Sequence, residues 1–256
     1  MRTASLMVAF AITIAGTAHA QPIDLSRYIM VDLTHELGVS TLAWPGSTTR
    51  FRLDTVRATA TGAMFNLFTP EHFGTHLDAP RHAAGAGWTN EAIPLVRLIA
   101  PAVVIDVVAK AAANRDYALT VADIEAHETR HGRIPAGAIV LLRTGWARYW
   151  TDSTRYFGRD ADGTLHFPSY GLEAARVLVE QRRVVAMGVD SPSTDIGAAR
   201  GFPVHALLGP AQVSGLENLA DLSALPPTGA TVFALPIKTV GGSGGPVRVV
   251  AIVPKR

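Results

Sequence analysis

His72-Phe-Gly-Thr-His-Leu-Asp-Ala-Pro-Arg-His82 is the stretch of this chain that says most about its fold and chemistry. It holds three of the nine histidines in 256 residues, where random scatter would place about 0.4 in eleven residues. Imidazole and carboxylate together are the usual ligand set for a divalent metal that catalyses hydrolysis. The segment therefore predicts a metal site.

The spacing of the candidate ligands indicates an extended chain with one bend. The candidates are separated by even numbers of residues and so share one face of a strand; they are His72, His76, Asp78 and His82. A helix fits badly, because it would swing Asp78 away from His76. A straight strand would separate His72 from His76 by about 13 Å, so we expect a bend at Gly74. The alternative is a surface loop that happens to be rich in histidine.

The first twenty residues have the pattern of a secretory signal peptide. Arg2 gives a positive start, residues 6–15 form an apolar run, and Ala18-His-Ala20 matches the cleavage site. The apolar run is too short to span a bilayer. We expect cleavage after Ala20 and a secreted or periplasmic protein; the alternative is an uncleaved anchor.

The composition of the remaining residues, 21–256, excludes several classes of protein. Their number is enough for one large domain. The chain has no Cys, so disulfides and thiolate ligands are excluded and a metal must be held by N and O atoms. The formal charge is only +2, and without a basic cluster we expect no nucleic-acid partner. No second apolar run is long enough to anchor the protein in a membrane.

The order of apolar runs and helical patterns predicts an α/β fold. Runs that suit strands buried on both faces are residues 28–33, 101–108, 138–143, 184–189, 231–235 and 247–253. Thr120 is a candidate N-cap for a helix over 121–130, and Ser169 for one over 170–183. A short helix is expected near Pro203. Residues 44–88 lack helical periodicity and should form strands and long loops.

Two further candidate ligands lie far along the chain. His205 follows Gly201-Phe-Pro203, and Glu217 follows Ser214-Gly215. Each alone is a weak signal, because a single histidine is more often structural and a glutamate is most often solvated.

The chain resembles the cyclase family, which includes bacterial kynurenine formamidases and isatin hydrolases. Residues 72–82 match its H-x-G-T-H-x-D-x-P-x-H signature. Further matching segments are Asp32-Leu-Thr-His35, Trp44-Pro-Gly46, Leu141-Leu-Arg-Thr144, Gly188-Val-Asp-Ser-Pro-Ser193, Gly215-Leu-Glu-Asn218 and Ala234-Leu-Pro-Ile-Lys238. The loop Gly241-Gly-Ser-Gly-Gly-Pro246 is closer to the isatin-hydrolase side.

The resemblance implies a fold, a metal site and an assembly. The fold would be a single domain of the swivelling β/β/α type, assembled as a homodimer or homotetramer. In the formamidase branch five side chains hold two zinc ions, and the matching positions here are His72, His76, Asp78, His205 and Glu217. In the isatin-hydrolase branch one manganese ion is held mainly by the first three. His82 matches the acid/base residue of the family.

Other side chains are candidates for binding or orientation. An aromatic wall for a planar substrate could come from Trp44, Phe65, Phe73 and Trp88, although core packing explains at least two of them as well. Asp190 would either orient a ligand histidine by accepting its other ring proton or cap a turn. The histidines expected to be structural or on the surface are His35, His127, His131 and His166.

The function these observations favour is metal-dependent hydrolysis of C–N amide bonds in aryl formamides or cyclic amides. Its partner would be a small-molecule substrate and its cofactor Zn²⁺ or Mn²⁺, as one or two ions. Two alternatives remain: a secreted protein that binds a ligand or metal without catalysis, and a lactone or ester hydrolase that uses the same site.

Overall fold

A computed structural model describes residues 24–255 of the chain. The predicted signal peptide, residues 1–20, lies outside the described residues. Among the described residues no helix is both long and apolar enough to cross a bilayer.

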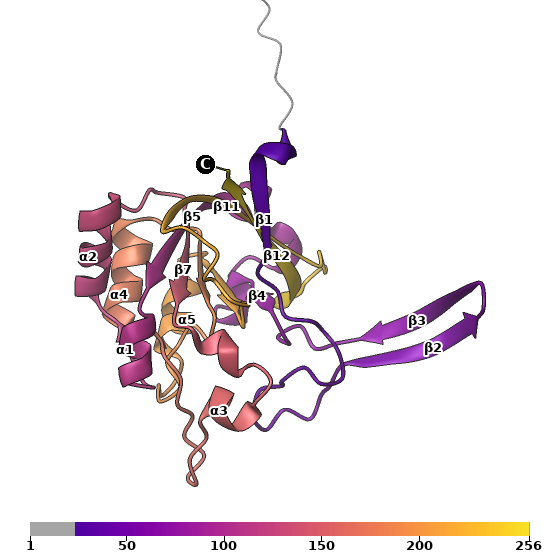
Figure 1. The fold of residues 1–256 in the computed structure, drawn as a ribbon. Helices are drawn as coiled ribbons and strands as arrows, with labels where there is room; N and C mark the ends of the chain where they lie inside the picture. The colour runs from indigo at the N-terminus through magenta and orange to yellow at the C-terminus, as the bar shows by residue number, and fades with distance from the viewer. Residues whose placement is uncertain (1–23, 256) are drawn as a thin grey trace, which may run out of the picture.

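A mixed sheet that closes on itself forms the centre of the molecule (Figure 1). Its strands in spatial order are β1 (Tyr28–Asp32), β12 (Gly244–Pro254), β11 (Thr228–Pro236), β5 (Ile99–Asp106), β7 (Ile139–Arg143), β9 (Ala186–Val189), β10 (Ser214–Glu217) and β4 (His76–Asp78). β4 pairs with β12 as well as with β10, so the order returns to β12 and leaves β1 outside the ring. Strands β5, β7, β9 and β10 run parallel, and the other pairs are antiparallel.

The apolar runs of β5, β7 and β9 form strands as predicted because both of their faces are buried. The run of β1 also forms a strand, but at the edge of the sheet, where Ile29 and Met30 are exposed. Alternate residues of one strand enter two different cores: Val104 packs inside the ring with Leu77, whereas Val103 packs outside it with Ile124. The outer core is covered by α2 (Val121–His131), α4 (Leu172–Arg176) and α5 (Pro203–Leu208). Helix α1 (Val108–Ala113) follows β5 in the chain (Figure 1).

The helix predicted over 121–130 is confirmed. Thr120 is its N-cap, and Thr120 and Asp123 form a reciprocal capping box. The helix predicted over 170–183 with Ser169 as its cap is wrong at its start. Ser169 Oγ instead donates to the carbonyl of Ser193 at 2.6 Å. This tertiary bond holds Ser169–Tyr170 as a short strand, and the helix starts two residues later.

The remaining elements are short. The strand Ser169–Tyr170 is β8 and pairs with β6 (Ala118–Leu119). α4 continues as a π-helix over Val177–Gln181, and the helix expected near Pro203 is α5 (Pro203–Leu208). The α-helix not yet described is α3 (Ser153–Phe157). The 3₁₀ helices are Leu25–Arg27, Pro80–His82, Asn90–Ala92, Leu95–Arg97 and Trp146–Tyr149.

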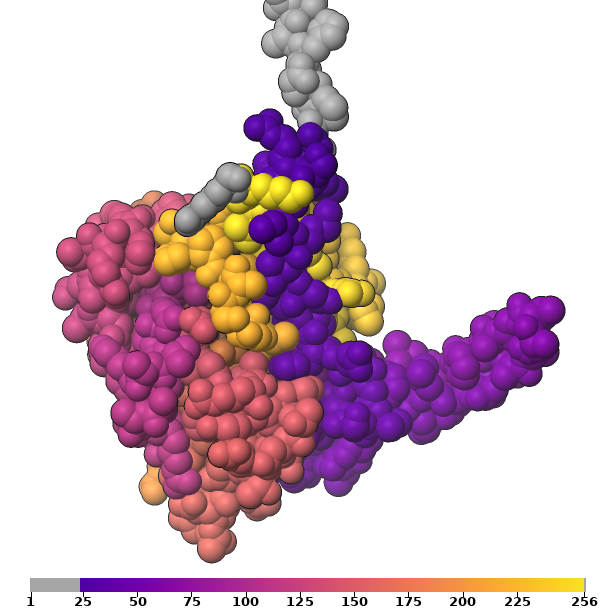
Figure 2. Space-filling view, viewed as in Figure 1, coloured from indigo at the N-terminus to yellow at the C-terminus, as the bar shows by residue number. Residues whose placement is uncertain are grey.

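Residues 44–88 contain a hairpin that stands away from the body. Strands β2 (Arg52–Thr59) and β3 (Gly62–Phe68) pair with each other and with no other described strand. Both views show this hairpin as an arm projecting into solvent (Figures 1 and 2).

Candidate metal centre

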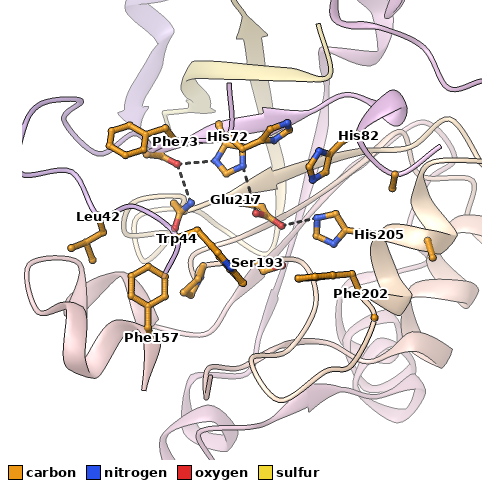
Figure 3. A pocket seen from close by; sticks show the side chains of 17 residues that line it. Leu42, Trp44, His72, Phe73, His82, Phe157, Ser193, Phe202, His205 and Glu217 are labelled. Carbon is orange, nitrogen blue, oxygen red and sulfur yellow. Dashed lines mark hydrogen bonds and ion pairs between the residues drawn. The ribbon is translucent and has the colours of Figure 1, made fainter. Parts of the chain in front are cut away.

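A cavity of about 490 Å³ lies between β4, α5, the loop after β9 and residues 42–44 (Figure 3). Side chains able to hold a metal gather in one part of it: His72, His76, His82, His205 and Glu217. Aromatic side chains line much of the rest: Trp44, Phe73, Phe157 and Phe202. The cavity thus combines metal-binding groups with a surface suited to a flat apolar molecule.

The bend predicted at Gly74 places the first ligands. Gly74 has φ of +64°, a conformation that costs glycine little. A Cβ added there would lie 3.2 Å from Leu37 Cδ1, so space also favours glycine. His76 Nδ1 contacts the Gly74 carbonyl oxygen at 2.9 Å. This bond leaves Nε2 of His76 for the site.

Strand pairing brings Glu217 to His76. In the antiparallel pair β10–β4, Glu217 lies opposite His76 and Gly215 opposite Asp78. His76 Nε2 lies 3.3 Å from Asp78 Oδ1 and 3.6 Å from Glu217 Oε2. Glu217 and His76, 141 positions apart in sequence, therefore meet through backbone register.

Asp78 has a glycine on each side of it in the sheet. Gly215 of β10 and Gly244 of β12 are its partners. A Cβ at Gly215 would lie 3.0 Å from Asp78 Oδ2, and one at Gly244 would lie 2.6 Å from His72 Cε1. The segment 241–246 therefore gives room to the candidate ligands.

His205 approaches from the opposite side, on α5. Its Nε2 lies 3.4 Å from Asp78 Oδ2 and 3.3 Å from Glu217 Oε1. Its Nδ1 lies 2.6 Å from Asp195 Oδ2. Three segments, β4, α5 and β10, thus meet at one point.

His72 and His82 lie on the other side of Asp78. His72 Nδ1 contacts Asp78 Oδ1 at 2.6 Å, and its Nε2 contacts Ser243 Oγ at 2.9 Å. The His82 ring lies against His72 with 3.8 Å between ring centroids. The structure thus brings together all five predicted ligands and the predicted acid/base residue.

This donor set fits a divalent cation. Ligand atoms of His76, Asp78 and Glu217 lie within 4.8 Å of one another, as do those of His72, Asp78 and His82. Asp78 Oδ2 is buried without a hydrogen-bond partner among the described residues. An unsatisfied buried carboxylate oxygen is costly, and a cation beside it would balance its charge. Nitrogen and oxygen donors of this kind suit zinc or manganese.

The pKa values of His76, His205 and Asp78 are shifted by the attraction between the imidazoles and the carboxylates. Burial alone would lower the pKa of His76, but the Asp78 and Glu217 carboxylates raise it to about 9. Burial opposes the rise at His205 too, yet Asp195 and Asp78 hold its pKa well above the usual range. Conversely, the pKa of Asp78 is held well below its usual value despite burial, chiefly by His76 and His205. In the absence of a metal, the protonated rings of His76 and His205 therefore balance the negative charge of Asp78.

His82 has a different environment. Burial is the main cause of its lowered pKa, with further lowering by His72 and His205 and opposition from Asp78 and Glu217. Its ring is therefore neutral near pH 7 and able to accept a proton.

Two of the four residues predicted for an aromatic wall line the cavity. Trp44 and Phe73 line the cavity, whereas Phe65 lies on the projecting strand β3 and Trp88 packs against the inner core and Arg97. The side chains that take their places are Phe157 and Phe202. The sequence around these two residues gave little indication that they line a site. Phe157 lies between the apolar runs 138–143 and 184–189, and Phe202 lies in the turn before Pro203.

Asp190 caps a turn and does not contact a histidine. Its carboxylate accepts bonds from the backbone N–H groups of Thr144 and Gly145, both at 2.8 Å. Burial raises its pKa to about 6, against the effect of these bonds. The residue that contacts a candidate ligand is Asp195, which sequence reasoning missed.

The remaining described histidines lie outside this site; they are His35, His127, His131 and His166. His127 and His131 belong to the sequence His-Glu-Thr-Arg-His on α2, a pattern that can bind zinc. Here Glu128 is committed to Arg182, with contacts of 2.6 and 2.8 Å, and the described residues offer no third ligand. Within residues 24–255, these histidines therefore belong to no second group able to hold a metal ion.

Comparison with known proteins places the chain in a family. Residues 31–196 match the model of the cyclase family. The chain therefore belongs to the cyclase family, as its signature segment led us to expect.

Relatives of known activity are hydrolases. The isatin hydrolase of Roseibium aggregatum is 38% identical over 193 residues, which cover 72% of this chain and 73% of that protein. The kynurenine formamidase of Salinibacter ruber is 28% identical over 228 residues, covering 86% and 96% of the two chains. The prediction that this protein is a hydrolase acting on C–N bonds other than peptide bonds is confirmed.

The fold is shared with a solved relative. Isatin hydrolase A from Labrenzia aggregata, bound to benzyl benzoate, superimposes with a TM-score of 0.84 at 36% identity. The match covers 90% of this chain and 95% of the other. The predicted α/β fold of the cyclase family is confirmed.

Proposed function

We propose that this protein is a metal-dependent hydrolase that cleaves C–N amide bonds in aryl formamides or cyclic amides. The observation that carries the proposal is the meeting of His76, Asp78, His205 and Glu217 beside an aromatic cavity. The similarity to isatin hydrolase and kynurenine formamidase supports the substrate class.

The cofactor in this proposal is Zn²⁺ or Mn²⁺, as one or two ions. His76, Asp78, His205 and Glu217 would hold a metal, and His72 would contribute on the Oδ1 side of Asp78. A bound divalent metal supplies a water of lowered pKa and a positive charge for the developing oxyanion. Asp78 has an oxygen on each side of the cluster and is thus able to serve either one ion or two.

His82 is the proposed proton carrier. Its ring borders the cavity, with centroids 3.8 Å from His72 and 5.5 Å from His205. Being neutral near pH 7, it can accept a proton from the attacking water. It then delivers that proton to the amide nitrogen, which leaves poorly until it is protonated.

The aromatic residues hold the flat part of the substrate. Trp44 contacts Phe157 and Phe202 with ring centroids 6.2 and 6.1 Å away. The cavity volume, about 490 Å³, lies within the usual range for small-molecule sites. This volume is large enough for a substrate with a single aryl ring.

A direct assay tests the proposal. Protein freed of metal and then loaded with zinc or manganese is incubated with N-formylkynurenine, isatin and a simple lactone. We expect turnover of the formamide or of isatin, abolished by a chelator and restored by metal. Turnover of the lactone alone would favour an ester hydrolase. Tight binding of the compounds without turnover would favour a non-catalytic binding protein.

We also propose export from the cytoplasm. The pattern of residues 1–20 supports a secreted or periplasmic location. Protein recovered from the periplasm or medium should begin at Gln21 by N-terminal sequencing. Recovery from the cytoplasm with residues 1–20 intact would contradict this location.

The β2–β3 hairpin supports a homodimer or homotetramer. Leu53, Phe65 and Leu67 lie on one face of it by register, and each is about half exposed, at 49%, 47% and 50%. A two-stranded hairpin is marginally stable on its own. We therefore expect a second copy of the chain to cover this face.

A further inference from the structure

The buried carboxylate of Asp195 lies behind the candidate ligand His205. Asp195 is 1% exposed and belongs to the loop that follows β9. Oδ2 accepts a bond from His205 Nδ1 at 2.6 Å and one from the His205 backbone N–H at 3.1 Å. Oδ1 accepts the backbone N–H of Val204 at 2.7 Å. Both oxygens therefore accept hydrogen bonds from α5 or from its His205 side chain.

These bonds fix α5 as well as the imidazole. Pro203 is the first residue of the helix, so Val204 and His205 carry its first free N–H groups. The preceding residue, Phe202, has φ of +50° and its side chain cannot cap them. Asp195 supplies the cap from outside the helix. The same carboxylate thus sets the position of the backbone and the ring of His205.

The orientation of the ring follows from the donor rules. A carboxylate accepts and does not donate hydrogen bonds, so the proton of the ring lies on Nδ1. When the neutral ring binds a metal, Nε2 presents its lone pair to the cluster, where it lies 3.4 Å from Asp78 Oδ2 and 3.3 Å from Glu217 Oε1. Thr194 Oγ1 also lies 3.3 Å from Nδ1.

Thr194, the residue before Asp195, contacts a second candidate ligand, Glu217. The Thr194 backbone N–H donates to Glu217 Oε1 at 2.8 Å, and Thr194 Oγ1 lies 3.3 Å from the same oxygen. Two adjacent residues of one loop therefore contact two candidate ligands that lie twelve positions apart in sequence.

We propose that Asp195 is the positioning residue of the metal centre, which holds His205 in the Nδ1–H form so that Nε2 can bind the ion. The inference rests on the proposed metal-binding role of His205. A carboxylate behind a ligand imidazole fixes its tautomer and strengthens it as a ligand. Asp195 touches neither substrate nor metal in this account.

Asp195→Asn separates this role from simple helix capping. The asparagine keeps an oxygen for the Val204 N–H but can place an NH₂ group beside His205 Nδ1. That group donates, so it favours a proton on Nε2, the nitrogen that faces the cluster. Asp123→Asn is the matched control, because Asp123 is also a buried aspartate that caps a helix, α2, outside the site.

The first measurement is metal affinity, by competition of zinc or manganese between the apo-protein and a chelator of known strength. We expect Asp195→Asn to bind the metal about 10- to 100-fold more weakly than the native chain and Asp123→Asn to bind it unchanged. Unfolding temperatures of the apo-proteins should fall for both variants. An unchanged metal affinity in folded Asp195→Asn would reduce Asp195 to a helix cap and overturn the proposal.

The second measurement needs no Asp195 variant and so stands if Asp195→Asn does not fold. The native protein is labelled with ¹⁵N in histidine, loaded with zinc and studied by ¹H–¹⁵N spectroscopy, with His205→Gln assigning the signal. We expect the His205 proton on Nδ1 and the metal on Nε2. A proton on Nε2 contradicts the inference. Because neither measurement uses a substrate, the inference can hold even if the amide assay fails, and the reverse also applies.

Discussion

At the scale of residues, Asp78 is the centre of the site. Its Oδ1 contacts His72 and lies 3.3 Å from His76, while its Oδ2 faces His205 and lacks a hydrogen bond among the described residues. Every other candidate ligand is within reach of one of these two oxygens or of Glu217. His82 packs its ring on His72 at the edge of the cluster, where its ligand atom also lies within 4.8 Å of those of His72 and Asp78; its proposed role as proton carrier therefore needs a direct test.

Replacement of His82 tests that role. We expect His82→Ala to keep its metal and to lose about 10²- to 10⁴-fold in rate, the usual contribution of a positioned acid or base. Metal content by elemental analysis and kcat on the best substrate provide the measurement. His131→Ala, which removes an exposed histidine on α2, should change neither. Loss of metal in His82→Ala would make His82 a ligand.

Metal uptake should depend steeply on pH. In the metal-free protein the carboxylates raise the pKa of His76 to about 9 and hold that of His205 well above its usual value, against burial. Both rings are then protonated at pH 7, and a metal must displace those protons. We expect apparent Mn²⁺ affinity to rise about tenfold or more per pH unit between pH 6 and 8. An affinity independent of pH would contradict imidazole ligation.

At the scale of elements, the N-terminus of α2 shows how local sequence fixes a helix. Asp123 Oδ2 accepts the Thr120 backbone N–H at 2.9 Å and the Tyr117 hydroxyl at 2.6 Å. Lys110 contacts the other oxygen. Burial would raise the pKa of Asp123, but the bonds with Lys110 and Thr120 lower it to about 2. The charged form of Asp123 therefore stabilises the folded state.

Asp123→Ala should lower the free energy of unfolding by about 1–2 kcal/mol at pH 7. Because the folded pKa is depressed, the contribution is complete above the unfolded pKa of about 4 and is lost as pH falls toward 2. Urea unfolding at pH 7, 5 and 3 measures it. The difference between the native chain and the variant should shrink at pH 3; a constant difference would contradict the account.

Local patterns predicted the elements that depend on local forces. The capping box at Thr120 and the doubly buried strands β5 and β7 could be read from neighbouring residues. Ser169 could not, because its hydroxyl bonds to Ser193 and not to the helix that follows. The pairing of β4 with β12, which closes the sheet, also has no local signal.

The candidate site divides in the same way. The spacing of residues 72–82 predicted the bend at Gly74 and the grouping of His76 with Asp78. His205 and Glu217 were assigned through resemblance to a family, since each alone is a common residue in a common setting. Asp195 and Phe202 were missed because their roles depend on how α5 packs against the loop after β9. Sequence patterns do not encode that packing.

In the whole molecule, the closed sheet assembles the candidate site, and the projecting β2–β3 hairpin provides a surface for association. Closure places β4 between β10 and β12 and so assembles the ligands from distant segments. The hairpin projects from the body (Figure 2), and the apolar side chains of Leu53, Phe65 and Leu67 on one of its faces are about half exposed. Such a face favours association.

Phe65→Glu should therefore dissociate the proposed homo-oligomer. The glutamate would place a charge on the face that carries Leu53 and Leu67, where a second copy would bury it. Met64→Glu is the control, because Met64 is 51% exposed and lies on the opposite face, paired with Arg57. Sedimentation velocity should show an oligomer for the native chain and Met64→Glu, and a monomer for Phe65→Glu. A monomeric native chain would contradict the proposal.

Anomalous X-ray diffraction from a crystal loaded with zinc or manganese would locate the proposed metal centre. We predict a strong peak bounded by His76 Nε2, Asp78, His205 Nε2 and Glu217, with or without a second peak beside His72. A metal bound elsewhere, or none between these four side chains, would contradict the account.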